Sequence, residues 1–248
     1  MLFMEALQKI KRGQFPPVLL FYGLETFFIQ HLKDALVKSV LGTQNVTDSL
    51  SIYDLEETPL DEVITDVETF PFFSEKKLII AHNPTFLLTK QPKLPVTHDL
   101  DRLETYVQHP VDYSVLLLIA PYEKLDQRKK ILKLMQQHAL VVECHEIKEQ
   151  EFAKWVTELT TALQVTIEPE VIDLLASELG LNLQLVENEL HKCALYVGEG
   201  GVITKEIAQE LLSHTDTSSA IRLVDAVIEQ NLQKAITIYH ELAKRQEE

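Results

Sequence analysis

The turn after the first apolar segment is where a nucleotide-binding protein would hold phosphate, and it lacks the groups for that task. Residues 23–28 read Gly-Leu-Glu-Thr-Phe-Phe, without the Gly-Lys-Ser/Thr of a P-loop. No lysine is present for the phosphates, no Lys-Ser/Thr pair supplies a hydroxyl to magnesium, and Glu25 would repel phosphate. A later apolar segment ends Ile119-Ala120-Pro121, without the acidic pair that holds magnesium and orients water. We therefore expect no nucleotide hydrolysis and no cofactor.

Metal and nucleophile chemistry are equally unsupported by the spacing of reactive residues. Cys144-His145-Glu146 is the one group of adjacent candidate ligands. Neighbouring side chains of an extended segment point to opposite faces, so adjacent residues rarely bind one ion together. The other histidines are scattered, and neither GxSxG nor HExxH occurs. We predict no metal site and no catalytic residue.

A cluster of three phenylalanines around a proline is the most informative segment. Phe70 extends the apolar stripe of the helix expected before it, so we expect this residue in the core. Phe72 and Phe73 are adjacent and cannot easily both point inward, so at least one should be exposed. One interpretation has all three anchor the loop to the core. The other has an exposed aromatic pair that inserts into a partner's pocket.

The densest basic cluster also has two interpretations. Its members are Lys124, Arg128, Lys129, Lys130 and Lys133. The favoured interpretation is the solvated face of a helix that buries Leu125, Leu132 and Met135. The alternative is a patch that faces DNA or a partner protein.

The composition is that of an acidic globular protein. The chain has 248 residues, a hydrophobic fraction of 46% and a formal net charge of −15. Such a charge excludes duplex-DNA binding through the overall field, because phosphate contacts need local positive charge. Only 7 glycines occur, which further disfavours a glycine-rich phosphate loop.

No feature of the sequence predicts export or membrane insertion. Cys144 and Cys193 are far apart and form no CxxC pair, as is normal in a reducing compartment. The N-terminus lacks the pattern of a signal peptide. The apolar run Val115–Ala120 is far shorter than the roughly 18 residues that a membrane span needs. We expect a soluble cytoplasmic protein.

Strand and helix patterns alternate in the first part of the chain. Short apolar segments predict strands at residues 18–22, 51–53, 78–81, 115–119 and 140–142. Helices are expected between them, at about residues 25–41, 58–69, 99–108 and 126–137. The helix after the second strand has its own start signal, with Thr58 as cap, Pro59 in the first turn and Asp61 at capping-box spacing. This order predicts an α/β fold with a mostly parallel sheet and helices on both faces.

The periodicity becomes entirely helical after about residue 146. Apolar stripes predict helices within residues 152–163, 171–179, 183–197 and 207–212, and no strand signal remains. A polar break at residues 214–219 precedes two more helical stretches, and the chain ends without a stop signal. We expect an α/β domain over residues 1–145, a small helical bundle over 146–214, and the start of a further helical region, cut short, over 215–248.

The order of these elements resembles the delta subunit of the bacterial DNA polymerase III clamp loader. The resemblance rests on Val18–Gly23 with Glu25, on Phe72–Leu78, on the helix Glu187–Lys192, and on Leu223–Ala226. It implies an AAA+-like α/β domain without Walker motifs, a helical lid and the beginning of a helical collar. Family members continue into the complete collar, which joins the other loader subunits.

The resemblance also implies a function and its residues. The clamp-contacting pair of the family falls on Phe72 and Phe73, with Pro71 and Ser74 beside them. These side chains would enter an apolar pocket of the ring-shaped sliding clamp, the beta subunit, and help one interface of the ring to open during replication. ATP would act in motor subunits, with a delta-prime type subunit as a further partner and DNA contacted only within the complex. Any polymerase activity would belong to the holoenzyme.

Two other functions are alternatives to clamp opening. A nucleotide-binding AAA+ ATPase or nucleotide kinase with an unconventional phosphate site would need basic or glycine-rich positions near Gly23, which are absent. A plain DNA-binding module would need salt-dependent affinity from the chain alone, and the acidic charge disfavours it.

Overall fold

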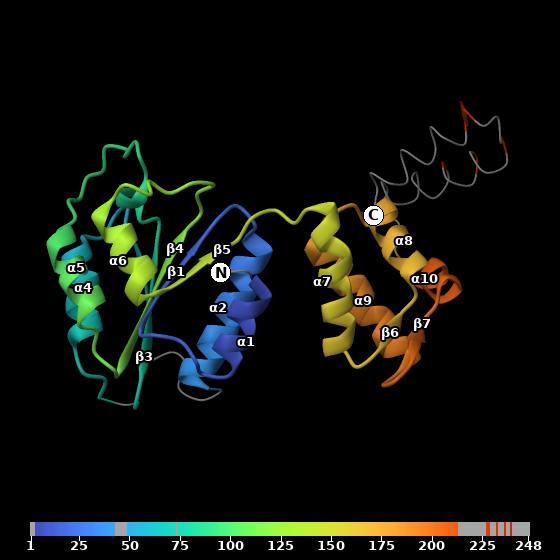
Figure 1. The fold of residues 1–248 in the computed structure, drawn as a ribbon, viewed down its shortest axis with the longest axis horizontal. Helices are drawn as coiled ribbons and strands as arrows, with labels where there is room; N and C mark the ends of the chain where they lie inside the picture. The colour runs from blue at the N-terminus through green and yellow to red at the C-terminus, as the bar shows by residue number, and fades with distance from the viewer. Residues whose placement is uncertain are drawn as a thin grey trace. The chain divides into compact units, whose positions relative to one another are not determined.

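The computed structural model describes residues 3–42, 49–72 and 74–212, together with positions 227, 228, 232, 236 and 239. The chain divides into two compact units, Met1–Glu146 and Ile147–Glu248 (Figure 1). The expected boundary between a lid and a collar, at residue 214, lies outside the described residues.

Unit 1 is built on a parallel sheet of five strands in the order β2-β3-β4-β1-β5. The strands are β1 (Val18–Tyr22), β2 (Leu50–Asp54), β3 (Lys77–His82), β4 (Ser114–Ala120) and β5 (Leu140–Glu143). Every residue of β1 and β4 is buried, because these strands lie inside the sheet and helices cover both faces. All five strands expected from the apolar segments are confirmed.

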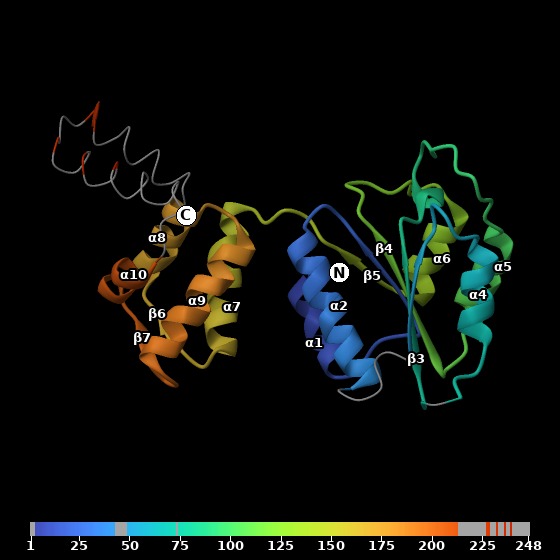
Figure 2. The ribbon, with the colours of Figure 1, turned by 180° about the vertical axis from the view of Figure 1, so that it is seen from behind.

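Helices cover both faces of the sheet, as Figures 1 and 2 show. One face carries α1 (Phe3–Lys11) and α2 (Thr26–Leu41), and the other carries α4 (Leu60–Glu68), α5 (Leu100–Gln108) and α6 (Lys130–His138). Parallel crossovers are almost always right-handed, so the direction of each connection along the sheet decides its face. The β1-to-β2 connection runs one way and all later connections run back, which places α2 opposite α4, α5 and α6. A short 3-10 helix, η1 (Thr85–Leu87), lies in the loop after β3.

Two predicted helix starts in unit 1 are wrong, and one helix was not predicted. The helix α1 was not predicted, although Phe3, Ala6 and Ile10 form its buried side. The predicted cap at Thr58 is wrong: Pro59 occupies the cap position of α4 without a side-chain bond, and the Thr58 amide donates to Asp54 instead (2.8 Å). The predicted start of α6 near residue 126 is also early, because residues 126–129 form a turn before the helix.

Unit 2 is a helical bundle with a small strand pair. Its helices are α7 (Glu149–Ala162), α8 (Pro169–Leu179), α9 (Leu183–Val197) and α10 (Lys205–Leu211). The strands β6 (Thr166–Ile167) and β7 (Val202–Ile203) pair in parallel, so the expectation that no strand remains is wrong. Each strand has two residues, which is too short for a period-2 pattern to appear in the sequence.

Candidate functional site

The loop between α4 and β3 begins with a defined helix end. The amide of Thr69 donates to the carbonyls of Thr65 (3.1 Å) and Asp66 (3.0 Å), which closes the last turn of α4. Thr69 itself is extended, with ψ at 129°. Pro71 has no amide hydrogen to continue a helix, so the chain leaves α4 here and returns at Lys77, the first residue of β3.

Phe72 stands out from this loop into solvent. Its side chain is 87% exposed, the highest value among the large hydrophobic residues of the described chain. Pro71 and Ser74 are partly buried, and the Ser74 hydroxyl donates to the carbonyl of Lys76 (2.9 Å). Phe73 lies outside the described residues. At least one member of the adjacent pair was expected to be exposed, and Phe72 is.

Phe70 is also exposed, which corrects the expectation that it anchors the loop in the core. Its exposed fraction is 61%, and its ring lies edge-on to that of Tyr113, with a centroid distance of 5.0 Å and an interplanar angle of 64°. The helical period that would have carried Phe70 to the buried stripe stops at Glu68, where α4 ends. The residue therefore leaves the stripe formed by Val63 and Val67.

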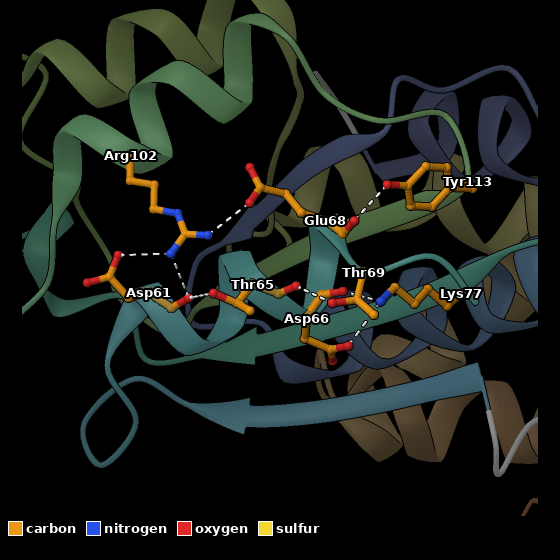
Figure 3. A network of polar contacts seen from close by, with 8 residues as sticks. All are labelled: Asp61, Thr65, Asp66, Glu68, Thr69, Lys77, Arg102 and Tyr113. Atoms are coloured by element: carbon orange, nitrogen blue, oxygen red, sulfur yellow. Dashed lines mark hydrogen bonds and ion pairs between the residues drawn. The ribbon is translucent and has the colours of Figure 1, made fainter. Parts of the chain in front are cut away.

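An ion pair between the buried Lys77 and the partly buried Asp66 holds the two ends of the loop together (Figure 3). The Lys77 ammonium donates to the carboxylate of Asp66 (3.0 Å) and to the carbonyl of the same residue. The Lys77 side chain is only 9% exposed. On the other side, the Tyr53 hydroxyl donates to the second carboxylate oxygen of Asp66 (2.9 Å). The end of α4 is thus fixed to the start of β3.

A second set of contacts connects the end of α4 with the chain beyond it. Arg102 on α5 bonds the carboxylate of Glu68 (2.8 Å) and, at the start of the helix, the carbonyl (3.2 Å) and carboxylate (3.4 Å) of Asp61. The Tyr113 hydroxyl donates to the carbonyl of Glu68 (2.7 Å), one of the helix-end carbonyls that lack a helical partner. The Lys77 amide donates to the carbonyl of Tyr113 (3.1 Å). Figure 3 shows both sets side by side along α4.

The electrostatics of Asp66 agree with this geometry. Burial alone would raise the pKa of Asp66, but hydrogen bonds from Ser51, Lys77 and Tyr53 outweigh it and hold the pKa below its usual range. Burial and the bond to Asp66 raise the pKa of Tyr53. The network was not identified from the sequence. The sequence feature that could have indicated this network is Lys77, a lysine directly before the apolar run of a strand expected to be buried.

The position of a P-loop is closed by the chain's own groups. The Gly23 amide donates to the carbonyl of Ala120 (3.1 Å), and the Glu25 amide donates to the carbonyl of Cys144 (3.0 Å). The Glu25 carboxylate caps α2 by accepting from the amide of Phe27 (3.1 Å). Burial raises the pKa of Glu25, while the bond from Phe27 acts against this. An internal carboxylate thus takes the helix end where a P-loop protein binds phosphate.

The basic cluster is largely engaged with neighbouring groups. Arg128 forms two bonds of 2.9 Å to the carboxylate of Asp126, and Lys130 pairs with Glu104 at 2.5 Å. Lys124 lies 3.4 Å from Glu123, and the Lys129 ammonium donates to the carbonyl of Phe86 (2.5 Å). Lys133 is exposed. Leu125, Leu132 and Met135 are buried as expected. These contacts favour the interpretation of the basic cluster as the solvated face of a helix. A patch that faces DNA or a partner protein stays a prediction.

The Cys144-His145-Glu146 segment brings no ligand set together. Cys144 is buried, and His145 lies 2.7 Å from the carboxylate of Glu143 on its own segment. Among the described residues, no group of three or more histidine, cysteine, aspartate or glutamate side chains could hold a metal ion. In the same part of the chain, no helix combines the length and apolar character that crossing a bilayer requires.

Fold and site together define a parallel α/β scaffold with a closed phosphate position and an exposed aromatic loop. A family model described as "DNA polymerase III, delta subunit" matches residues 19–145. The DNA polymerase III subunit delta of Bacillus subtilis (strain 168) is 32% identical over 241 residues, which cover 97% of this chain and 70% of that protein. A solved structure of the B. subtilis DNA clamp loader delta protein matches with a TM-score of 0.89 at 32% identity, over 99% of this chain and 73% of that one.

These matches place the chain in a class of replication accessory proteins, the subunits of the DNA clamp loader. Within that class the chain belongs to the DNA polymerase III delta-subunit family. The fold class and the family expected from the sequence are both confirmed.

Proposed function

We propose that this chain binds the ring-shaped sliding clamp through Phe72 and Phe73 and helps to open the ring for loading onto primed DNA. The observation that carries the proposal is the 87% exposure of Phe72 on a loop whose two ends are fixed by the Lys77–Asp66 pair. A large apolar side chain that stands in water on a fixed base is suited to enter a partner's pocket.

The energetics of two phenylalanines are sufficient for this role. Burying both rings contributes about 3–6 kcal/mol before ordering costs are subtracted. A base that is already ordered lowers those costs, because fewer backbone and side-chain rotations are lost on docking. Binding opens the ring only to the extent that the open form binds more tightly than the closed form.

The absence of catalysis is part of the proposal. The Gly23 and Glu25 amides and the end of α2 are occupied by groups of the chain itself, which supports a subunit that neither binds nor hydrolyses ATP. ATP would act in motor subunits of the loader. Calorimetry with Mg-ATP tests this point: micromolar binding by the isolated chain would favour the ATPase or kinase alternative.

The remaining assignments follow the family. We assign unit 2 a lid-like spacer role and residues 215–248 a part of the collar. The partners would be the clamp, the ATPase motor subunits and a delta-prime type subunit, with DNA contacted through the assembled complex. The place of action would be the bacterial cytoplasm, where the chromosome is replicated.

The docking role is tested by replacing the aromatic pair. The double substitution Phe72→Ala and Phe73→Ala should raise the Kd for the cognate clamp at least about a hundredfold. The Tm should stay within about 2 °C, since exposed side chains contribute little to stability. Leu195→Ala is the matched control, because Leu195 is 85% exposed on α9 of unit 2 and should not affect the Kd. Retained clamp binding by the double variant would refute the proposal.

Opening is tested separately from docking. A clamp whose subunit interface has been weakened should bind the chain more tightly than the intact ring, and a clamp cross-linked across its interfaces should bind no more tightly than the intact ring. Equal affinity for all three forms would leave a docking protein that does not open the ring.

A further inference from the structure

We propose that unit 2 carries an interaction surface of its own, at the end of α9, for a neighbouring loader subunit that presents an apolar spot surrounded by lysine or arginine. This surface, the α9 end, consists of Leu195, Tyr196 and Val202, with Glu199 in the turn between them. The inference rests on the proposed place of this chain in the loader and adds a contact in a different unit from the clamp-binding loop.

The α9 end exposes three large apolar side chains. Leu195 is 85% exposed, Tyr196 61% and Val202 47%. Helix α9 packs against β7, and Figures 1 and 2 both show the end of α9 beside this strand, so the three residues lie at one end of the unit. Single exposed hydrophobic residues are common, but a group of them at one place is typical of a surface that binds another protein.

The core of unit 2 does not explain these side chains. Leu190 and Cys193 lie on the buried face of α9. Leu195 is two residues beyond Cys193 and five beyond Leu190, which at 100° per residue turns it to the opposite side of the helix. Its leucine side chain therefore contributes little to packing within the unit.

The backbone that carries the α9 end is held by hydrogen bonds. The Gly198 amide donates to the carbonyl of Ala194 (3.0 Å) and closes the last turn of α9, and the Gly201 amide donates to the carbonyl of Gly198 (3.0 Å). The Gly200 amide donates to the carbonyl of Gln164 (2.8 Å), which fixes the turn to the connection between α7 and β6. A surface on a fixed support loses little freedom on docking, so more of the gain from burying its side chains is kept as affinity.

The charge around the α9 end indicates the partner. Residues 147–212 hold twelve acidic residues against four lysines, and the lysine of α9, Lys192, is already paired with Glu189 (2.5 Å). Glu199 is exposed in the turn itself. Such a surface repels the phosphates of nucleic acid, and a second copy of this chain would bring two acidic units together. A basic protein surface is complementary to it.

The occupant follows from this charge and from the family. Because the chain belongs to a family of loader subunits, the partner is another subunit of that complex. Its apolar spot would cover Leu195 and Tyr196, and its lysine or arginine side chains would face Glu199. Tyrosine suits the centre of such a contact, since its ring is buried while its hydroxyl can keep a hydrogen bond.

The test measures the Kd of the full chain for the other purified subunits of the cognate loader, by fluorescence titration. Leu195→Ala and Tyr196→Ala should each raise this Kd about five- to tenfold. Glu199→Lys should raise it about threefold at low salt and less at about 0.5 M salt, where screening weakens charge contacts. The Tm of all three variants should stay within about 2 °C of the wild type. Ile52→Ala is the matched control, since Ile52 is 62% exposed on β2 of unit 1, and should change the Kd less than twofold.

Several outcomes would overturn the inference. One is a Kd for the loader subunits that stays within twofold of the wild type in both Leu195→Ala and Tyr196→Ala. Another is a lower Kd for Glu199→Lys, which would indicate an acidic partner. If the apolar substitutions raise the Kd for the clamp instead, the clamp is the occupant. If they abolish self-association of the isolated chain in sedimentation experiments, the occupant is a second copy.

Failure of the proposed function gives a different result. A wild-type chain that does not assemble with the loader subunits would remove the partner assignment and this inference with it. Clamp binding is measured independently, because the double substitution of Phe72 and Phe73 should raise the Kd for the clamp and leave assembly with the loader subunits unchanged. The α9-end variants should show the reverse, with assembly weakened and clamp binding retained.

Discussion

Lys77 is the residue on which the geometry of the aromatic loop depends most. A buried ammonium is costly unless it is paired and hydrogen-bonded, and Lys77 finds both kinds of partner in Asp66. Because Asp66 lies near the end of α4 and Lys77 begins β3, this one contact fixes where the loop starts and where it ends. The ion pair that provides the buried Lys77 ammonium with a partner also fixes the base of the proposed docking surface.

The first prediction concerns the loss of this lysine. Lys77→Met should lower the free energy of unfolding by about 1–3 kcal/mol, because it leaves the partly buried Asp66 carboxylate without its cation. Urea unfolding followed by circular dichroism measures the change. Lys76→Met is the matched control, since Lys76 is exposed and should cost less than about 0.5 kcal/mol. Equal effects of the two substitutions would contradict the structural role given to Lys77.

The second prediction concerns acid. The pKa of Asp66 is lowered in the folded chain, so its contribution to stability is present above the ordinary aspartate value of about 4 and is lost as the pH falls through the lower folded value. Asp66→Asn should therefore be less stable than the wild type at pH 7, and the difference should shrink as the pH is lowered below about 4.

Denaturant titrations from pH 7 to pH 2 would measure this difference. Trp155, the single tryptophan, lies in unit 2, so its fluorescence follows the unit without the substitution and serves as an internal control. A difference between Asp66→Asn and wild type that stays constant with pH would contradict the assigned pKa shift.

At the scale of the elements, long and regular apolar patterns predicted the strands and helices correctly. The end of α4 and the two-residue strands, which leave no such pattern, were missed. The buried strands β1 and β4 are uniform apolar runs, and α2 ends at Gly42 as expected. The strand pair β6 and β7 is too short to leave a pattern. The prediction for Phe70 was wrong because hydrogen bonds from the Thr69 amide close the last turn of α4, and such capping contacts have no periodic signal.

The candidate site was predictable to the same extent. The exposure of at least one of Phe72 and Phe73 followed from their adjacency, a property of the sequence alone. The network of Lys77, Asp66 and Tyr113 joins residues far apart in the chain, and only the fold brings them together. Pairing of that kind cannot be obtained from local spacing.

The third prediction concerns the turn between β1 and α2. Gly23 has a φ of 138°, and a Cβ at this position would lie 1.9 Å from the carbonyl oxygen of Cys144. Gly23→Ala should cost about 3 kcal/mol or more, from backbone strain and from the displacement of β5 that the clash requires. Gly13→Ala is the control, because Gly13 also has positive φ (68°) but nothing within 4 Å, and should cost about 1–2 kcal/mol. Thermal unfolding of both variants decides between strain alone and strain with a clash.

At the scale of the whole molecule, charge is the dominant property. The formal net charge is −15, and residues 143–178 alone hold nine acidic residues against two lysines. The main basic cluster does not offset this, because Arg128 and Lys130 are paired with carboxylates. We therefore expect a subunit with this charge to rely on other chains for contact with nucleic acid.

The fourth prediction follows from that charge. The isolated chain should show no measurable affinity for primed or duplex DNA at 50–150 mM salt, by fluorescence anisotropy with roughly micromolar protein. Arg128→Gln should not alter this result. Submicromolar binding at low salt that falls steeply as salt is added would instead assign the basic cluster to DNA.

The cap formed by Glu25 on α2 has a consequence for any attempt to build a phosphate site into this scaffold. Introducing a lysine at that position would remove the helix cap, and the amides of Gly23 and of residue 25 would still be bonded to Ala120 and Cys144. Freeing the site would require the turn, the strand ends and the cap to change together, because these groups bond one another. A single substitution at position 25 should therefore lower the Tm without creating a phosphate site.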